Sequence, residues 1–408
     1  MRIALEALSL LGDRTGVGRY TEHLVRSLIR YASDAMEELH LLFFAVALRR
    51  KTRRLLKQTV HDLDEWSPVL RCTSCPIPLG VLYRSWDYLG FPPVEWLTGD
   101  VDICHGPNYI VPPSRTARTL ATVHDMTLFT FPEAYTRDAL AVRPRIVRSL
   151  HRCDAMLADS EATKRDLMDV LHIPEDQITV VYLAPSLRWT VEEGGNHDGR
   201  RKADDTRPLS GQDGGAQDRL RAYGIYRPYL LCVGTIEPRK NIARLVRAYG
   251  RLRQEKKIPH QLVLAGKWGW KYKDVVDTVE ELSREVLRPE DIVFMGYVSK
   301  GDLRTLYREA EVCVYPSLYE GFGLSPLEAM ACGTPVVTSN ISALPEVIGN
   351  AGVLVDPYDV EALAEGIYTV IDHPALREAM REKGWAQAQR FTWERCAKET
   401  MAVYRRLL

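Results

Sequence analysis

The chain has 408 residues, 46% of them hydrophobic and 26% charged, which is the composition of an ordinary globular protein. Its 54 Lys and Arg residues balance its 54 Asp and Glu residues, so no net charge is present to attract nucleic acid. At about 100–200 residues per domain, the length predicts two domains, or three.

The longest apolar stretch, residues 41–48, is far shorter than the about 20 residues of a membrane-spanning helix. The N-terminus runs directly into a strand-like pattern and lacks the features of a secretory signal, so we expect a cytoplasmic protein. The eight cysteines are too few for a disulfide scaffold. Cys72 and Cys75 form one C-x-x-C without the second pair of a zinc ribbon, so we expect no metal site.

Short strand-like runs alternate with helical patterns along the first half. The first strand leads into a segment in which Gly16 and Gly18 open a helix, although glycines in such a loop also serve ordinary turns. Residues 120–123 and 155–158 have the apolar character of buried parallel strands. Ser160 follows the second of these as an N-cap, and residues 162–171 have helical spacing.

Polar side chains follow two strands of this half. His124 and Asp125 come directly after the strand at residues 120–123, while His105 and Asn108 follow an earlier one. Ligands of open parallel sheets bind beyond the carboxyl ends of the strands, so these four residues are candidates for a site. A single histidine at a strand end is also common as a structural residue. The aromatic group of Trp86, Tyr88, Phe91 and Trp96 is interpreted as core or as an acceptor pocket.

Residues 188–220 separate the two halves and differ in composition. Few apolar side chains occur from Glu192 to Asp218, and the segment is rich in glycine. Such a segment cannot bury enough surface to offset the entropy of ordering it. We interpret it as a flexible insertion and linker without chemistry.

The second half predicts another α/β domain. Its strand candidates are residues 229–233, 261–265, 291–295, 312–315 and 334–338, with helical segments at residues 242–254 and 302–310 between them. Such alternation predicts a parallel sheet covered by helices on both faces. The fold class is therefore α/β, with doubly wound domains at residues 1–187 and 221–389 and a binding cleft between them. The helical residues 390–408 are expected to pack back on the first domain.

Two cations follow the strand at residues 229–233. Arg239 and Lys240 lie where the next helix begins, and positive charge there is unfavourable against the helix dipole unless an anion is bound. The alternative is a solvated turn with two surface cations.

The most informative segment runs from Glu320 to Glu328. Gly321 and Gly323 would let backbone N–H groups approach a ligand closely. Ser325 is predicted as the N-cap of a helix with Pro326 in its first position, which offers free N–H groups to an anion. The alternative for Glu328 is a capping box with Ser325. An unpaired, partly buried carboxylate is costly, so Glu320 is interpreted as an acceptor for ligand hydroxyls.

Glu320 and Glu328, with seven residues between them, match the Glu-x7-Glu motif of retaining GT-B glycosyltransferases. The sequence from Tyr315-Pro-Ser through Glu320-Gly-Phe-Gly-Leu and Glu328-Ala-Met-Ala-Cys-Gly-Thr-Pro-Val-Val closely resembles glycosyltransferase family 4. The resemblance covers most of residues 225–400 and continues more weakly through the N-terminal half. It implies a GT-B fold and transfer of a sugar from a nucleotide-sugar donor, with no metal and no other cofactor.

The resemblance also implies roles for individual residues. Lys240 matches the lysine that contacts the donor diphosphate, and Arg239 substitutes for a family arginine whose usual place is taken here by Thr235. His124 matches a histidine near the reacting centre, Glu320 would hold the sugar hydroxyls, and Glu328 the ribose. The other donor-side candidates are Gly16, Gly18, Gly234, Gly321, Phe322, Gly323, Leu324 and Ser325.

On the acceptor side the resemblance implies a glycan or lipid-linked acceptor near Asp125, Asn108 and His105, with peripheral contact to the inner face of the membrane through Arg49–Lys57. Residues 234–241 are similar to bacterial enzymes that use GDP-mannose for polysaccharide or glycolipid assembly, while UDP-glucose, UDP-N-acetylglucosamine and dTDP-rhamnose stay open as donors. The sequence offers no second carboxylate for a double displacement, so internal return through a short-lived ion pair is favoured. The alternatives are a pyridoxal-phosphate-dependent phosphorylase of the same architecture and a non-catalytic sugar-nucleotide-binding subunit.

Overall fold

The computed structural model describes residues 1–11, 16–44, 54–57, 59, 69–187, 214–226 and 228–408. These residues form two compact units. The first unit takes in Met1–Ala184, Glu320–Phe322 and Phe391–Leu408, and the second takes in Pro185–Tyr319 and Gly323–Arg390. Three separate stretches of the chain therefore build the first unit.

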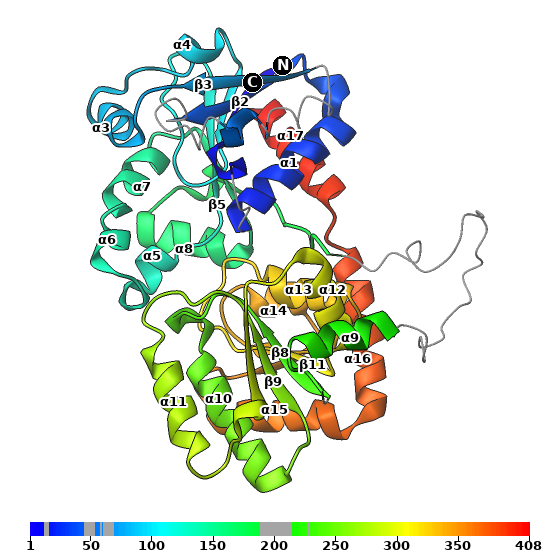
Figure 1. Cartoon of the computed structure of the whole chain (residues 1–408). Helices are drawn as coiled ribbons and strands as arrows, with labels where there is room; N and C mark the ends of the chain where they lie inside the picture. Colours follow the sequence, from blue (N-terminus) through cyan, green and yellow to red (C-terminus); the bar gives the residue numbers. More distant parts are fainter. Residues whose placement is uncertain (12–15, 45–53, 58, 60–68, 188–213, 227) are drawn as a thin grey trace, which may run out of the picture. The chain divides into compact units, whose positions relative to one another are not determined.

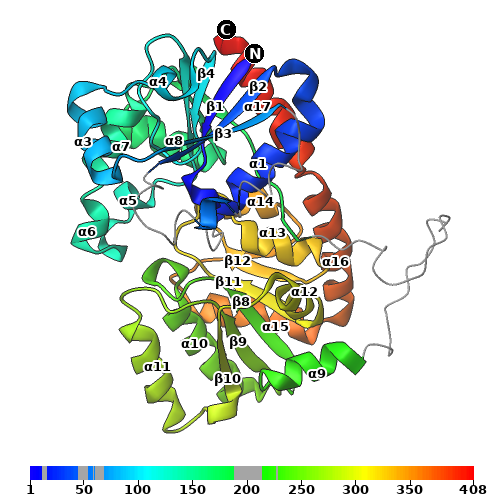
Figure 2. The same cartoon turned by 45° about the horizontal axis from the view of Figure 1, so that its top comes forward.

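The first unit contains a parallel sheet of seven strands in the order β3-β2-β1-β4-β5-β6-β7, of which Figure 2 labels β1 to β4. The order reverses between β1 and β4, which makes the sheet doubly wound. The strands are β1 (Arg2–Glu6), β2 (Glu38–Phe44), β3 (Leu70–Cys75), β4 (Ile103–Gly106), β5 (Arg118–Val123), β6 (Ala155–Ala158) and β7 (Ile178–Val180).

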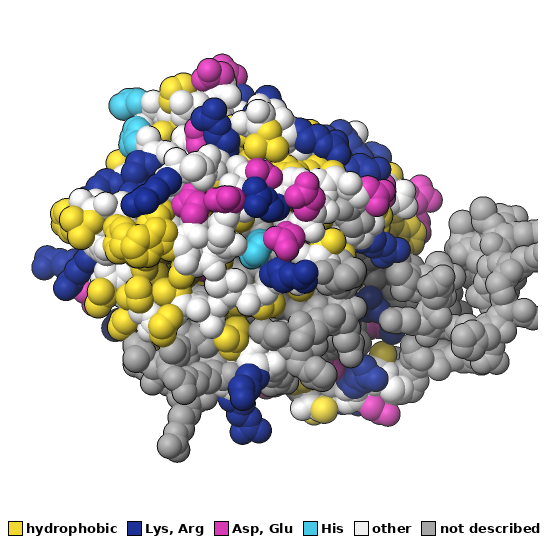
Figure 3. All heavy atoms as spheres, turned by 90° about the horizontal axis from the view of Figure 1, so that it is seen from above, with side chains coloured by type: hydrophobic (Ala, Val, Ile, Leu, Met, Phe, Trp, Pro, Cys, Tyr) yellow, Lys and Arg dark blue, Asp and Glu magenta, His cyan; other side chains and the backbone are white. Residues whose placement is uncertain are grey.

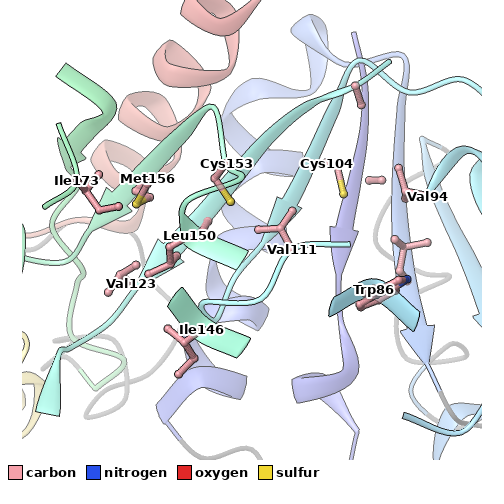
Figure 4. Packing of buried hydrophobic residues seen from close by; sticks show 14 of the residues in the cluster. Trp86, Val94, Cys104, Val111, Val123, Ile146, Leu150, Cys153, Met156 and Ile173 are labelled. Carbon is pink, nitrogen blue, oxygen red and sulfur yellow. The ribbon is translucent and has the colours of Figure 1, made fainter. Parts of the chain in front are cut away.

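Helices cover both faces of this sheet because most of its strands, among them β1, β2, β4 and β6, are buried on both sides. On one face α1 (Gly16–Ala32) packs against α17 (Trp393–Leu407). On the other, α3 (Leu79–Leu89), α7 (Arg143–Leu150) and α8 (Glu161–Leu171) enclose the buried cluster that Figure 4 shows, with Trp86, Ile146 and Met156 among its members. The remaining helices of this unit are short: α4 (Glu95–Thr98), α5 (Thr127–Thr130) and α6 (Arg137–Leu140).

The second unit has a parallel sheet of six strands in the order β10-β9-β8-β11-β12-β13, with the reversal between β8 and β11. The strands are β8 (Tyr229–Val233), β9 (Gln261–Ala265), β10 (Ile292–Gly296), β11 (Val312–Tyr315), β12 (Val336–Ser339) and β13 (Val353–Val355). The helices are α9 (Gly214–Ala222), α10 (Ile242–Arg251), α11 (Lys273–Ser283), α12 (Lys300–Glu309), α13 (Leu324–Ala331), α14 (Leu344–Ile348), α15 (Val360–Asp372) and α16 (Pro374–Gln389).

The predicted α/β class with two doubly wound sheets is confirmed, and the buried strands β6, β8, β9 and β11 have the predicted bounds. The end of the segment expected to be a flexible linker is helical, because Leu220 of α9 is buried against the second unit. The predicted helix at residues 242–254 ends as an α-helix at Arg251 and continues as a π-helical turn, Leu252–Lys256. Within the described part of the chain, no helix is long and apolar enough to cross a bilayer.

Candidate functional site

In the second unit the carboxyl ends of β8 and β11 lie side by side, at the reversal of strand order where ligands of open sheets bind. Gly234 follows β8 with a φ of 154°, a conformation that favours glycine. A Cβ at Gly234 would lie 3.4 Å from Cε of Lys240, and a Cβ at Gly266 would collide with the Gly234 carbonyl oxygen. The Lys240 stem thus lies in contact range of Gly234, and the backbone of Gly234 packs directly on Gly266.

Lys240 ends a 3-10 turn, Pro238–Lys240, and is 8% exposed. Its Nζ hydrogen-bonds the hydroxyl of Tyr315 and lies 4.7 Å from the centre of that ring. Asn241 fixes the turn, because its Nδ2 donates to the carbonyl oxygens of Pro316 at 3.0 Å and Pro357 at 2.7 Å. The Lys240 ammonium is therefore buried and held at the end of β11.

Arg239 ties this turn to the residues that precede Glu320. Its guanidinium pairs with Glu237 at 2.8 Å and donates to the Tyr319 carbonyl oxygen at 2.9 Å. The Leu318 N–H donates to the Arg239 carbonyl oxygen at 2.8 Å. Both members of the ion pair are largely buried, so these contacts favour a positioning role for Arg239 over direct contact with a diphosphate.

Glu320–Phe322 pack within the first unit, at the carboxyl ends of β5 and β6. The Gly321 carbonyl oxygen accepts hydrogen bonds from the hydroxyls of Ser160 at 2.6 Å and Thr163 at 3.2 Å. A Cβ at Gly321 would lie 1.7 Å from the His124 carbonyl oxygen, so only glycine fits there. Phe322 packs edge-on against Phe391, with ring centres 5.6 Å apart. These contacts hold the neighbouring Glu320, which is 8% exposed.

Helix α13 begins earlier than the sequence suggested. Gly323, with a φ of 111°, is the residue at the N-cap position, and the helix starts at Leu324. The prediction that Ser325 is the N-cap and Pro326 the first helical residue is therefore wrong, because the positive φ of Gly323 turns the chain two residues sooner. No side chain caps this end of α13, so the capping box between Ser325 and Glu328 is not formed either.

Glu328 lies inside α13 and is 4% exposed. Burial, and after it the negative charge of Glu328, raises the pKa of Cys332 to about 12. The same two causes raise the pKa of Tyr307 well above its usual value. The carboxylate of Glu328 is thus placed beside Tyr307 and Cys332.

His124 forms a buried pair with Asp159, a residue that the sequence reading did not select. The last paired residues of β5 and β6 are Val123 and Ala158, so His124 and Asp159 are neighbours at the sheet edge. His124 Nδ1 lies 2.7 Å from Oδ2 of Asp159, and Nε2 lies 2.8 Å from the Pro107 carbonyl oxygen. Because a carboxylate and a carbonyl oxygen only accept, this geometry favours the imidazolium form of His124, in which both ring nitrogens carry protons.

The pKa directions agree with that geometry. Burial lowers the pKa of His124, but the charge and hydrogen bond of Asp159 and the Pro107 carbonyl together raise it above its usual value. Burial raises the pKa of Asp159, and the positive charge of His124 offsets part of that rise. The two side chains are 13% and 3% exposed, so water screens the pair little.

The acceptor-side candidates differ in their surroundings. Asp125 accepts a hydrogen bond from the Thr127 N–H at 2.9 Å and so caps the turn into α5. Asn108 is exposed. His105 is fully buried and bonds Tyr404 at 2.7 Å and Thr122 at 2.8 Å, and burial lowers its pKa to about 3. These contacts favour a structural role for His105, which ties β4 and β5 to α17.

The glycine loop of the first unit is described only from residue 16 onward. Gly16 is the exposed first residue of α1, and a Cβ there would meet open space. Gly18 is buried in the first turn of the same helix. Of the predicted membrane-contact segment Arg49–Lys57, residues 49–53 lie outside the described residues, while Arg54 and Lys57 are exposed.

Two family models match the chain. Residues 14–184 match the family described as Glycosyltransferase Family 4, and residues 222–387 match the family described as Glycosyl transferases group 1. Among curated proteins, O-antigen chain mannosyltransferase B of Escherichia coli is 36% identical over 397 residues, which is 96% of each chain.

Solved structures resemble the whole chain. Sucrose-phosphate synthase from Thermosynechococcus elongatus gives a TM-score of 0.70 at 23% identity and covers 100% of this chain and 98% of its own. HepE of Anabaena, solved in complex with UDP-glucose, gives a TM-score of 0.67 at 16% identity over 99% of both chains. At such identities the likeness shows the fold alone, and it confirms the predicted GT-B architecture.

Proposed function

The chain is a member of the family 4 glycosyltransferases, and from that premise we propose that it transfers mannose from GDP-mannose to a glycan or lipid-linked hydroxyl with retention of configuration. The observation that carries the choice of sugar is the 36% identity, over nearly the full length, to an enzyme named as an O-antigen mannosyltransferase. The matched families are described as glycosyltransferases, so the comparisons do not favour the phosphorylase or the non-catalytic subunit.

In this proposal Lys240 stabilises the negative charge that grows on the leaving diphosphate. This role of Lys240 is supported by the burial of its ammonium at the carboxyl ends of β8 and β11. The free N–H groups at the start of α13, at Leu324 and Ser325, add donors and the positive end of a helix dipole. At Gly16, Gly18 and Gly234 the donor diphosphate is proposed to approach the backbone closely, because these residues have no side chain. The proposal assigns this work to protein groups and requires no metal ion or cofactor.

Glu320 is proposed to accept hydrogen bonds from the sugar hydroxyls and Glu328 from the ribose. Support for Glu320 comes from the contacts that hold Gly321 and Phe322 beside it. Arg239 acts as a positioning residue through Glu237 and the Tyr319 carbonyl. Asn108, which is exposed after β4, is the proposed acceptor-side residue.

His124 is proposed to position the reacting centre rather than to act as a general base. A carboxylate oxygen and a carbonyl oxygen face its two ring nitrogens, which favours an imidazolium, and an imidazolium has no lone pair to take a proton. Retention by internal return needs no protein base. The bond between the anomeric carbon and the diphosphate oxygen breaks, the acceptor oxygen attacks from the same face, and its proton passes to the departing phosphate.

A thermal-shift series with GDP, UDP, dTDP and ADP tests the proposed donor. GDP at about 100 times its dissociation constant adds about 2.7 kcal/mol, which should raise the melting midpoint by about 5–11 °C. The other three nucleotides should shift it much less at the same concentration. A larger shift with another base would overturn GDP-mannose as donor, and no shift with any nucleotide would contradict nucleotide-sugar binding altogether.

Glu320→Gln separates sugar recognition from nucleotide binding. The amide replaces one acceptor oxygen by an NH2 donor and removes the charge. Losing a hydrogen bond to a charged group costs about 1.5–3 kcal/mol, so kcat/KM for transfer should fall by about 10- to 150-fold. The GDP-induced shift in melting midpoint should be unchanged, because Glu320 is assigned to the sugar and not to the nucleotide. Equal activity in the variant, or an equal loss of GDP affinity, would refute that assignment.

A further inference from the structure

Helix α3 is apolar on two faces, of which only one is buried. Leu82 and Trp86 point into the core, and the Trp86 indole donates to the Pro92 carbonyl oxygen at 3.1 Å. Val81 and Tyr88, one heptad apart, lie on the outer face and are 58% and 77% exposed. Packing in the core accounts for the first pair and not for the second.

The exposed apolar surface continues beyond the end of α3. Leu89 is 75% exposed, and Phe91 packs edge-on against Trp96 of α4, with ring centres 4.6 Å apart. Trp96 is itself 63% exposed. The aromatic group interpreted as core or acceptor pocket thus divides, since Trp86 alone is buried. We call Val81, Tyr88, Leu89, Phe91 and Trp96, together with Arg84, the α3–α4 surface.

Arginines border this surface. Arg84 is exposed one turn before Tyr88, and the Arg148 guanidinium lies 5.6 Å from the centre of the Tyr88 ring. Arg145 and Arg148 both pair with Asp87, which is 5% exposed, so two positive charges face one buried negative charge. Figure 3 shows apolar side chains gathered at the left of this face of the first unit with Lys and Arg beside them.

The acidic groups near the surface do not cancel that excess. The carboxylate of Glu95 turns toward the loop at residues 114–117 and accepts hydrogen bonds from Ser114 at 2.5 Å and from the Arg115 N–H at 2.9 Å. Although burial raises the pKa of Glu95, these hydrogen bonds and that of Thr116 lower it to about 2. Asp100 is exposed beyond α4. Arg84 is the one exposed charged side chain on the outer face of α3.

We propose that the α3–α4 surface docks on a lipid bilayer with anionic headgroups. Trp and Tyr are the side chains that settle at the membrane interface, and basic residues near an anionic surface each add attraction. Tyr88 and Leu89 keep about three quarters of their surface exposed, and a fluid bilayer accepts such projecting groups without a preformed pocket. The proposal does not depend on which donor the enzyme uses.

Co-sedimentation of the full chain with lipid vesicles tests the proposal. The chain should bind vesicles of equal parts phosphatidylglycerol and phosphatidylcholine and bind phosphatidylcholine alone weakly. The double variant Tyr88→Ser/Trp96→Ser should lose binding by about tenfold or more, because two interfacial aromatic groups are removed. Arg84→Gln should weaken binding by about fivefold, and less at high salt.

A matched control lies in the second unit. Tyr226 and Tyr297 are 70% and 63% exposed, close to the values of Tyr88 and Trp96, so Tyr226→Ser/Tyr297→Ser should bind vesicles like the wild type. Equal binding by Tyr88→Ser/Trp96→Ser and the wild type would overturn the proposal. So would a wild-type dimer in size-exclusion chromatography that this variant dissociates, because a second copy of the chain would then cover the surface.

Discussion

Lys240→Ala is expected to lower kcat for sugar transfer by about 10²- to 10³-fold, the range seen when one preorganised charge-stabilising group is removed. The ammonium is buried and held by the hydroxyl and ring of Tyr315, so no neighbouring water replaces it readily. The loss should appear in kcat as well as in kcat/KM, because charge on the diphosphate grows toward the transition state. Steady-state kinetics with GDP-mannose would measure it.

Lys273→Ala is the matched control for this substitution. The Lys273 side chain is 82% exposed and pairs with Asp277 one helical turn away, and such an exposed contact adds little to stability. Its kcat should equal that of the wild type. If Lys240→Ala folds with a normal melting midpoint and keeps near wild-type kcat, the role of Lys240 on the diphosphate is wrong.

The second large effect is on stability. Asp159→Asn should destabilise the first unit by about 3–5 kcal/mol, because removing one partner leaves the His124 imidazolium buried without its counter-charge. For a unit of this size the melting midpoint should fall by about 6–20 °C in differential scanning calorimetry. Asp277→Asn, which breaks an exposed ion pair, should leave the midpoint within about 2 °C.

The same pair predicts the sign of the pH dependence. The pKa of His124 in the folded chain is raised above its usual value, so its stabilising contribution is complete below about pH 6.5 and is lost as pH rises through the folded pKa. The difference in melting midpoint between the wild type and Asp159→Asn should therefore be widest at pH 6 and narrower at pH 9. A difference that grows with pH would contradict an ionised His124–Asp159 pair.

The sequence alone was enough for the central strands of the second sheet, because they are buried on both faces and form unbroken apolar runs. The strands β8, β9 and β11 could thus be bounded from composition and periodicity. The ends of helices were predicted less accurately than the strands. Ser160 is an N-cap as predicted, with its hydroxyl bonded to the Thr163 N–H, whereas at α13 the backbone conformation of Gly323 overrides the Ser-Pro signal.

For the candidate site, motifs identified single residues but not their partners. Asp159 is 35 residues from His124, and only the register of β5 on β6 brings them together. His105 was placed on the acceptor side because its partner Tyr404, 299 residues away, cannot be assigned without the packing of α17. A search for polar residues following adjacent strands would have found Asp159, while nothing local would have revealed the bond between Ser160 and Gly321.

The contribution of α17 to the first unit bears on how the chain is made. The stacking of His23 on Trp393 and the bond between His105 and Tyr404 join segments synthesised far apart in time. The roughly 200 residues between Ala184 and Phe391 take about 10–40 s to translate at about 5–20 residues per second. Throughout that interval the nascent first unit exposes, on the ribosome, the side of α1 that α17 later covers, and a chaperone can bind there.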